Sequence, residues 1–254
     1  MFKNKLKELI KEGKAGIGTF VMCNSPDIVE VIALTGFDFI VIDTEHGPLS
    51  VESTQNLIRA AELRGITPIT RVTECSETTI LRSLDVGAHG IQVPQVNDRK
   101  TAEDVVRRAK YYPEGYRGIA MPRAANYGTV NPLDYFKIEN EETMVVVHCE
   151  NKIGLDNLEE IVKVPSIDVI FLGPFDMSQS LGIPGQVNHP LIEQAAERVL
   201  KVSKSAGKAA GIFVSTGEQA KLRREQGFQY ITIGMDVTLF GIVCKNEIAK
   251  AKSN

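Results

Sequence analysis

The sequence predicts an α/β protein folded as a closed (β/α)8 barrel, a TIM barrel, with a short N-terminal helix at about residues 3–12. Three observations support this fold. Short apolar runs alternate with segments of helical periodicity, eight such runs occur, and 254 residues is close to the usual length for eight βα units. We therefore expect residues 1–254 to form a single barrel domain.

The eight expected strands are rich in Val, Ile and Phe and are bounded by turn residues. They are GIGTFVM (16–22), FDFIVID (37–43), TPITRV (67–72), HGIQVP (89–94), TMVVVHCE (143–150), DVIFLG (168–173), AAGIFV (209–214) and QYITIG (229–234). Continuous apolar strands indicate that both faces are covered, which fits a barrel and a doubly wound sheet alike. The doubly wound alternative is disfavoured, because no G-x-G-x-x-G motif follows the first strand and no P-loop occurs.

Local signals place helices between these strands. Ser25, Pro26 and Asp27 predict a capped helix start, and residues 215–218 predict a capping box. Three glycines are expected to end helices in the left-handed conformation, namely Gly36, Gly87 and Gly227.

Two connections are longer than the usual two to six residues. They span about residues 111–131 and 173–190. Long βα loops lie at the carboxyl ends of barrel strands, where substrates bind. We therefore expect both loops to enclose a ligand.

Composition excludes several classes of protein. The 29 Lys and Arg nearly balance the 32 Asp and Glu, so nothing favours nucleic acid or an anionic membrane surface as partner. No 18-residue uncharged apolar run predicts a membrane span, and the basic N-terminus lacks the apolar stretch of a signal peptide. We expect a cytoplasmic protein whose four separated cysteines form no disulfide framework.

Polar side chains gather where the predicted strands end. In a parallel barrel these ends meet at one mouth, so their side chains converge. The residues concerned are Asp43, His46, Arg71, Gln92, Gln95, His148, Glu150 and Asp176.

Glu150 and Asp176 follow adjacent strands. Two carboxylates at one mouth repel each other unless a cation or a shared proton compensates, and a hard oxygen donor set favours Mg²⁺ or Mn²⁺. The alternative is that one of the two acids caps a helix and the other is a solvated loop residue. Spacing alone does not decide between the two interpretations. His148 is expected to form a pocket wall or to support Glu150 rather than to bind the ion.

Asp43 and His46 are close enough in sequence for the carboxylate to accept the imidazole N–H and orient it. His46 is then a candidate general base, and the alternative is a loop histidine packed against Pro48. Arg71 ends an apolar strand, so its guanidinium must face a polar cavity or form an ion pair with Glu74 or Asp43.

Taken together, the segments GFDFIVIDTEHGP, PITRV, GAHGIQVPQV, YYPEGYRGI, VVVHCE and DVIFLGPFDMSQSLG resemble the HpcH/HpaI family of metal-dependent 2-keto acid aldolases. The resemblance covers about residues 15–240. It implies the barrel and a divalent cation, Mg²⁺ or Mn²⁺ with Co²⁺ as a third option, held by Glu150 and Asp176. It also implies Arg71 as the catalytic arginine, His46 as the base and Asp43 as its orienting acid.

The resemblance further implies a homo-oligomer, a trimer or hexamer, in which a neighbouring subunit contributes the acid corresponding to Asp85. The expected substrate-binding residues are Arg71, His148, Pro174, Phe175 and Asp85. Two of them depart from the family pattern, since His148 stands where Gln is common and Phe175 where a small residue is common.

The implied reaction is a reversible class II aldol cleavage of a 4-hydroxy-2-oxo acid into pyruvate and an aldehyde. The Schiff-base route is disfavoured, because no expected strand carries a lysine at its carboxyl end, Lys152 and Lys208 being misplaced. Two other readings stay open, a lyase acting on a CoA thioester or phosphonate, and a barrel that serves as a binding scaffold. CoA needs a basic groove, for which the chain offers only Arg107, Arg108, Lys110, Arg117 and Arg123.

Overall fold

The computed structural model describes residues 3–253. In it, eight parallel strands close into a barrel. Each strand pairs with the next along the chain, and β8 pairs with β1. The eight predicted strands are confirmed to within about two residues. They are β1 (Gly16–Val21), β2 (Phe39–Asp43), β3 (Thr67–Arg71), β4 (Gly90–Val93), β5 (Met144–Cys149), β6 (Val169–Leu172), β7 (Ala209–Val214) and β8 (Tyr230–Met235).

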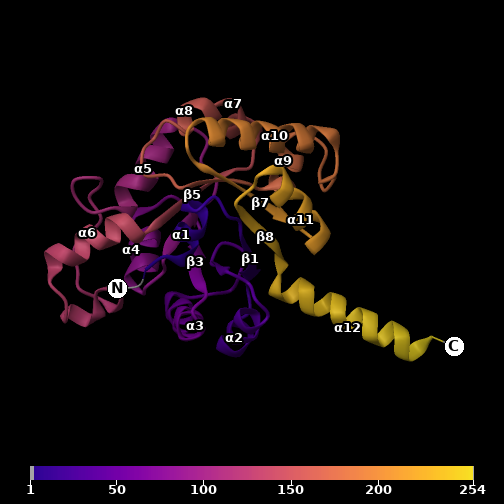
Figure 1. Ribbon diagram of the computed structural model, residues 1–254, viewed down its shortest axis with the longest axis horizontal. Coiled ribbons are helices and arrows are strands. Elements are labelled where there is room, and N and C mark those ends of the chain that lie inside the picture. Colours follow the sequence, from indigo (N-terminus) through magenta and orange to yellow (C-terminus); the bar gives the residue numbers. More distant parts are fainter. Residues whose placement is uncertain (1–2, 254) are drawn as a thin grey trace.

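Helices surround this barrel, and the last of them extends away from it (Figure 1). They are α1 (Lys5–Lys11), α2 (Pro26–Leu34), α3 (Val51–Arg64), α4 (Glu77–Asp85), α5 (Arg99–Ala109), the 3₁₀ helix η1 (Arg123–Gly128), α6 (Pro132–Glu142), α7 (Lys152–Asp156), α8 (Leu158–Ile161), α9 (Pro174–Ser180), α10 (Pro190–Ser205), α11 (Gly217–Gln226) and α12 (Asp236–Lys252). The predicted N-terminal helix is confirmed as α1.

The core has an inner and an outer layer, as both faces of the strands are apolar. Inside the barrel, Phe39, Phe171 and Tyr230 pack with aliphatic neighbours, and Leu6 of α1 reaches this cluster. The buried Asn4 caps α1 and donates hydrogen bonds to the carbonyls of His89 and Glu142. The short N-terminal helix thus closes the amino end of the barrel, which leaves the carboxyl end for a site.

Most predicted helix boundaries are confirmed. The Ser25 hydroxyl accepts the N–H of Ile28, and Gly36, Gly87 and Gly227 all have positive φ. The capping box predicted at residues 215–218 is wrong, because the helix starts one residue later and the reciprocal bond goes to the residue before the N-cap. Thr216 is the N-cap, and the side chain of Gln219 accepts the N–H of Ser215.

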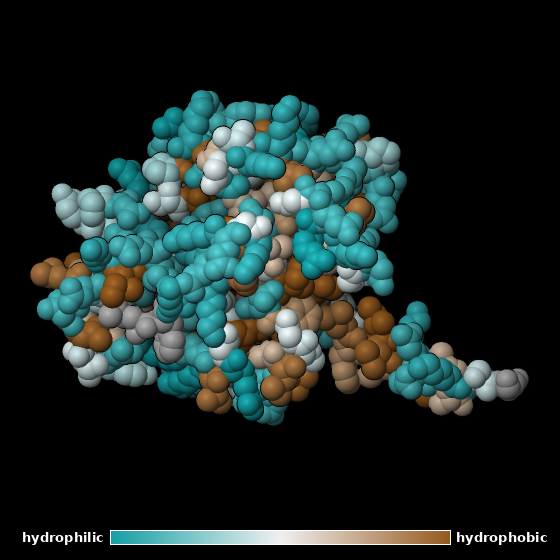
Figure 2. All heavy atoms as spheres, viewed as in Figure 1, coloured by the Kyte–Doolittle hydropathy of each residue, from teal (hydrophilic) through white to brown (hydrophobic). Residues whose placement is uncertain are grey.

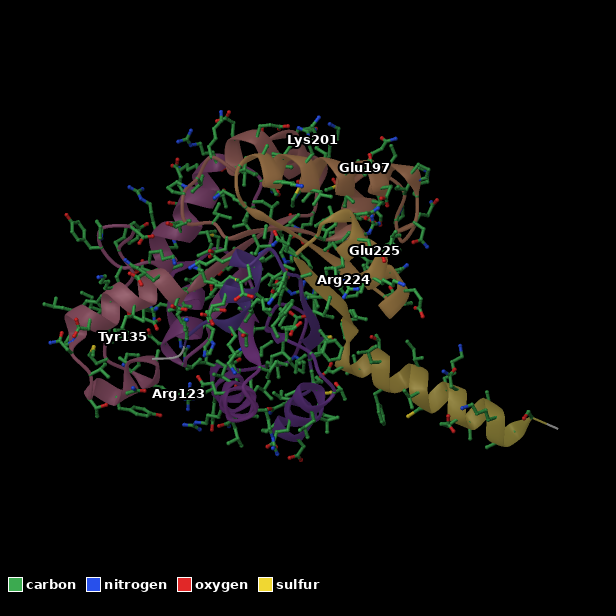
Figure 3. The ribbon with its side chains drawn as sticks, in the orientation of Figure 1. Arg123, Tyr135, Glu197, Lys201, Arg224 and Glu225 are labelled. Carbon is green, nitrogen blue, oxygen red and sulfur yellow. The ribbon has the colours of Figure 1, made fainter. Side chains whose placement is uncertain are left out.

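The two long connections lie at opposite ends of the barrel, so one of the two loop predictions is wrong. The segment 173–190 follows β6 and begins at the mouth, as predicted. The segment 111–131 follows α5, which reverses the chain direction after β4, so this segment leads back into the amino end of β5. Its Arg123 pairs with Glu62 of α3, and Figure 3 shows Arg123 and Tyr135 together in the lobe formed by η1 and α6.

Among residues 3–253, no helix combines the length and the apolar character that crossing a membrane requires.

Candidate active site

A cavity of about 250 Å³ at the carboxyl end of the barrel collects most of the predicted site residues. Its polar lining consists of His46, Arg71, His148, Glu150 and Asp176. These side chains come from the ends of β2, β3, β5 and β6 and the loops that follow them. Residues separated by 130 positions therefore face one space, because parallel strands end at the same rim.

Arg71 is buried at this rim and pairs with Asp43 on the neighbouring strand. Asp43 and Arg71 are register partners between β2 and β3. The Nε of Arg71 donates to Asp43 Oδ1 over 2.9 Å, a second guanidinium nitrogen donates to Oδ2, and a third lies 3.2 Å from Glu45. The guanidinium therefore both lines the cavity and forms the Asp43 ion pair that the sequence left open as an alternative. The other candidate partner, Glu74, is not used.

Asp43 also shapes the turn that carries His46. Its Oδ1 accepts the backbone N–H groups of Glu45 and His46, each over 3.1 Å. The chain passes so close to itself here that a Cβ on Gly47 would lie 2.3 Å from the carbonyl oxygen of Asp43. The predicted contact between Asp43 and the imidazole is replaced by this contact to the backbone of His46. His46 itself lines the cavity and is exposed to solvent.

Glu45 is a charged neighbour to which sequence reasoning gave no role. Burial is the largest influence on this carboxyl and raises its pKa, although Arg71 acts in the opposite direction; the charge of Glu150 raises the pKa further. Its position between Asp43 and His46 in the same turn was the available signal. Glu45 shares Arg71 with Asp43 and so adds negative charge beside the cavity.

Glu150 is the most deeply buried acid of the cavity, with 3% of its surface exposed. Its Oε1 accepts the backbone N–H of Gln95 and its Oε2 accepts from His148 Nδ1, over 2.7 and 2.6 Å. Burial opposes ionisation, but His148, the Gln95 N–H and Arg71 together outweigh it and lower the pKa of Glu150. A Cβ on Gly173 would lie 3.1 Å from Oε2, so glycine leaves room for this carboxylate.

Asp176 lies in the first turn of α9 and is exposed to the cavity. Within residues 3–253 its carboxylate makes no hydrogen bond or ion pair to protein. The same part of the chain contains no group of three or more His, Cys, Asp or Glu side chains arranged to hold an ion. Two carboxylates, one ionised by its surroundings and one free, fit a hard divalent cation that keeps water and takes substrate oxygens.

Aromatic side chains form the rest of the lining, and the sequence did not identify most of them. Phe20 lies under the guanidinium of Arg71, 4.8 Å from its ring centroid. The predicted Phe175 is half exposed and packs edge-on against Phe213, and Phe171 stacks on His148 at 4.9 Å. Aromatic side chains thus make up much of the cavity lining.

Asp85 is not part of this cavity. It ends α4, which runs back toward the amino ends of the strands, and its carboxylate accepts a 2.8 Å bond from the buried Arg117. A role for Asp85 in a neighbouring subunit stays a prediction.

Three comparisons with known proteins agree with one another. A family model described as HpcH/HpaI aldolase/citrate lyase matches residues 16–241. The 2-keto-3-deoxy-L-rhamnonate aldolase of Escherichia coli (strain K12) is 31% identical over 255 residues, covering 100% of this chain and 95% of that protein. A solved HpcH/HpaI aldolase/citrate lyase family protein from Burkholderia cenocepacia J2315 has a TM-score of 0.93 and 31% identity, with 99% and 100% of the two chains covered. The solved citrate synthase SbnG has a TM-score of 0.88 and 35% identity, with 97% of each chain covered.

The Asp43–Arg71 pair yields a stability prediction. Asp43→Asn removes a buried charge whose partner stays buried, so the free energy of unfolding should fall by about 3 kcal/mol. Glu45→Gln is the matched control, since Glu45 is only half-buried and contributes one longer contact. Urea denaturation of the two variants measures the difference, and equal destabilisation would show that the pair does not hold this end of the barrel together.

Proposed function

The chain belongs to the HpcH/HpaI aldolase/citrate lyase family, and we propose that this carbon–carbon lyase cleaves a 4-hydroxy-2-oxo acid, of the 2-keto-3-deoxy sugar acid type, reversibly into pyruvate and an aldehyde. The observation that supports this most is the single cavity lined by Glu150, Asp176, Arg71 and His46. Together they offer two acids for an ion, one fixed positive charge and one group that exchanges protons.

Glu150 and Asp176 are the residues that would hold the divalent cation, Mg²⁺ or Mn²⁺. When bound, such an ion acts as a Lewis acid that polarises the 2-oxo acid and lowers the energy of the enolate formed by cleavage. Glu150 is suited to this because its pKa is lowered and its two oxygens are each fixed by one hydrogen bond. Each oxygen keeps a further lone pair for a ligand.

Arg71 supplies positive charge where the enolate oxygen develops. A charge that is already in place at the transition state needs no reorganisation, and such charges are among the largest catalytic contributions. Asp43 and Glu45 hold the guanidinium from behind, and the ring of Phe20 lies beneath it. The orientation of Arg71 is therefore set before substrate binds.

His46 takes the proton from the C4 hydroxyl during cleavage, directly or through one water, and returns it during condensation. The imidazole is on the cavity and open to solvent, so it can exchange this proton. Asp43 positions it through the backbone of the turn. No lysine lines the cavity in the described part of the chain, which disfavours a Schiff-base route.

The lining favours an aldehyde with an uncharged, apolar end. Arg71 is the one cation among the described lining residues, and it is already paired with two acids. The apolar part of the lining includes Phe175, Phe213 and Met235. The E. coli relative is named for a 6-deoxy sugar acid, whose cleaved aldehyde ends in a methyl group, and the apolar part of the lining suits such an end.

A second candidate function is the condensation performed by a citrate synthase. It is favoured by the identity with SbnG, 35% against 31% for the E. coli aldolase. It is disfavoured because a CoA nucleotide would need accessible basic residues, and two of the candidates are not accessible. Lys110 and Arg117 are buried, and Lys110 donates to two backbone carbonyls within the protein.

The proposed homo-oligomer is supported by α12. Asp236 ties its first turn to the backbone N–H groups of Met22 and Cys23, but from Phe240 onward every described residue of α12 is exposed. Figure 1 shows α12 leaving the barrel, and Figure 2 shows apolar side chains along it and on the surface where it starts. A helix with apolar residues open to water is stabilised by packing on another surface. A second copy of this chain is the proposed partner.

Metal removal tests the main proposal. Pyruvate release from 2-keto-3-deoxy-L-rhamnonate, followed with a coupled lactate dehydrogenase assay, should cease after EDTA treatment and return with Mg²⁺ or Mn²⁺. Borohydride added with pyruvate should leave no covalent adduct by mass spectrometry. Activity that survives exhaustive chelation, or a trapped adduct, would contradict the proposed chemistry.

Acetyl-CoA and oxaloacetate test the second candidate. We expect no release of free CoA thiol above the rate without enzyme, because the chain lacks an exposed basic groove at the cavity. Thiol release that depends on Glu150 would reverse the order of the two candidates.

The role of α12 predicts a change of assembly. Phe240→Asp places a charge on its exposed apolar face and should lower the mass measured by light scattering to that of a smaller species. Glu247→Gln, on the same helix, is the control and should leave the mass unchanged. A wild-type protein that elutes as a monomer would rule out this packing.

A further inference from the structure

A line of hydrogen bonds crosses the interior of the barrel and ends at Glu150. The Tyr230 hydroxyl on β8 donates to Gln92 Oε1 on β4 over 2.7 Å. Gln92 Nε2 lies 2.7 Å from His148 Nε2, and His148 Nδ1 lies 2.6 Å from Glu150 Oε2. Tyr230 is not among the residues that line the cavity. The sequence predicted that His148 forms a pocket wall or supports Glu150, and the bond to Glu150 agrees with this, but the links to Gln92 and Tyr230 were not predicted.

All four side chains are buried. Tyr230 and Gln92 are 0% exposed, His148 is 2% and Glu150 is 3%. Buried polar groups without partners cost free energy, so each bond in the line has a definite donor and acceptor. Burial also raises the pKa of Tyr230 well above its ordinary value, so its hydroxyl keeps its proton.

The donor in each bond follows from chemistry. A carboxylate only accepts, so His148 Nδ1 carries the hydrogen that Glu150 receives. The Tyr230 hydroxyl donates to the carbonyl oxygen of the Gln92 amide, which turns the amide NH2 toward His148. An NH2 group only donates, so His148 Nε2 presents its lone pair. Tyr230 thereby fixes the tautomer of His148 that donates to Glu150.

The reversed arrangement lacks an acceptor for the hydrogen of the Tyr230 hydroxyl, whose oxygen could then only accept from the turned NH2 group. If the Gln92 amide turned by 180°, its oxygen would face His148 Nε2 and favour a hydrogen there. Nδ1 would then point a lone pair at the Glu150 carboxylate, and the bond would be lost. Within residues 3–253 the Tyr230 hydroxyl makes no other hydrogen bond, so only the first orientation of the amide gives its hydrogen an acceptor.

We propose that Tyr230 is a positioning residue of the active site, which fixes the Glu150 carboxylate for the cation through Gln92 and His148; this role rests on the function proposed above. Groups that orient a metal ligand contribute about 10- to 100-fold to metal affinity. The line also explains the departure at residue 148. A Gln there would carry its own NH2 donor, whereas a His needs a neighbour that selects its tautomer.

The test is Mn²⁺ affinity, measured by calorimetry on the full-length protein with Mn²⁺ alone. Tyr230→Phe should weaken Mn²⁺ binding about 10-fold or more while its melting temperature still shows a folded protein. In the His148→Gln background, where residue 148 carries its own NH2 donor, adding Tyr230→Phe should cause no further loss of Mn²⁺ affinity. Tyr111→Phe is the matched control, a buried tyrosine away from the cavity, and should bind as wild type does.

Two outcomes would overturn the role of Tyr230. One is unchanged Mn²⁺ affinity in Tyr230→Phe, and the other is an equal loss in the wild-type and His148→Gln backgrounds, which would indicate a merely structural effect. Mn²⁺ binding absent from wild type would instead overturn the proposed function, and the role of Tyr230 with it.

A second measurement needs neither metal nor a Tyr230 variant. In metal-free protein labelled with ¹⁵N-histidine, the His148 signals, identified by their absence from His148→Gln, should show hydrogen on Nδ1 and none on Nε2. Hydrogen on Nε2, whether or not Nδ1 also carries one, would contradict the direction of the hydrogen bonds and overturn the proposal.

Discussion

The site depends on keeping Glu150 ionised in a nearly dry position at the end of the barrel. Burial alone would favour the neutral acid, since a carboxylate loses the stabilisation of water. The hydrogen bonds from His148 and the Gln95 N–H and the field of Arg71 reverse that preference. An acid held in this state attracts a cation, while Asp176 reaches the same cavity from the first turn of α9.

The barrel provides this arrangement through strand register. Asp43 pairs with Arg71, and Arg71 with Gln92, as neighbours across β2, β3 and β4. Asp43 and Arg71 therefore pair across neighbouring strands, while Gln92 bonds to His148 on the next strand and to Tyr230 across the barrel. The strands that carry the packed aromatic core of the barrel also carry the charged side chains at its mouth. Close packing of the core therefore fixes the positions of these charges.

The fold was predictable because its signals are local. Apolar runs, caps and glycine stops each occupy a few residues, and eight repetitions of them leave few alternatives. The exception is residues 111–131, whose length predicts a loop at the mouth, although helix α5 carries the chain to the other end of the barrel first. The convergence of the acids, Arg71 and His46 followed from strand ends alone. The pair of Arg71 with Asp43 was one of two alternatives that the sequence left open, and strand register selects it. The line from Tyr230 was not predictable, since it depends on which residues oppose one another across the barrel, up to 138 positions apart.

The central claim is that Glu150 and Asp176 hold one divalent cation that a 2-oxo acid chelates. The most direct measurement is a crystal structure of the protein with saturating Mg²⁺ and oxalate, a stable mimic of the pyruvate enolate. It should show one ion bound by both carboxylates, with oxalate chelating the ion beside Arg71. No ion between the two carboxylates, or oxalate bound elsewhere, would contradict the claim.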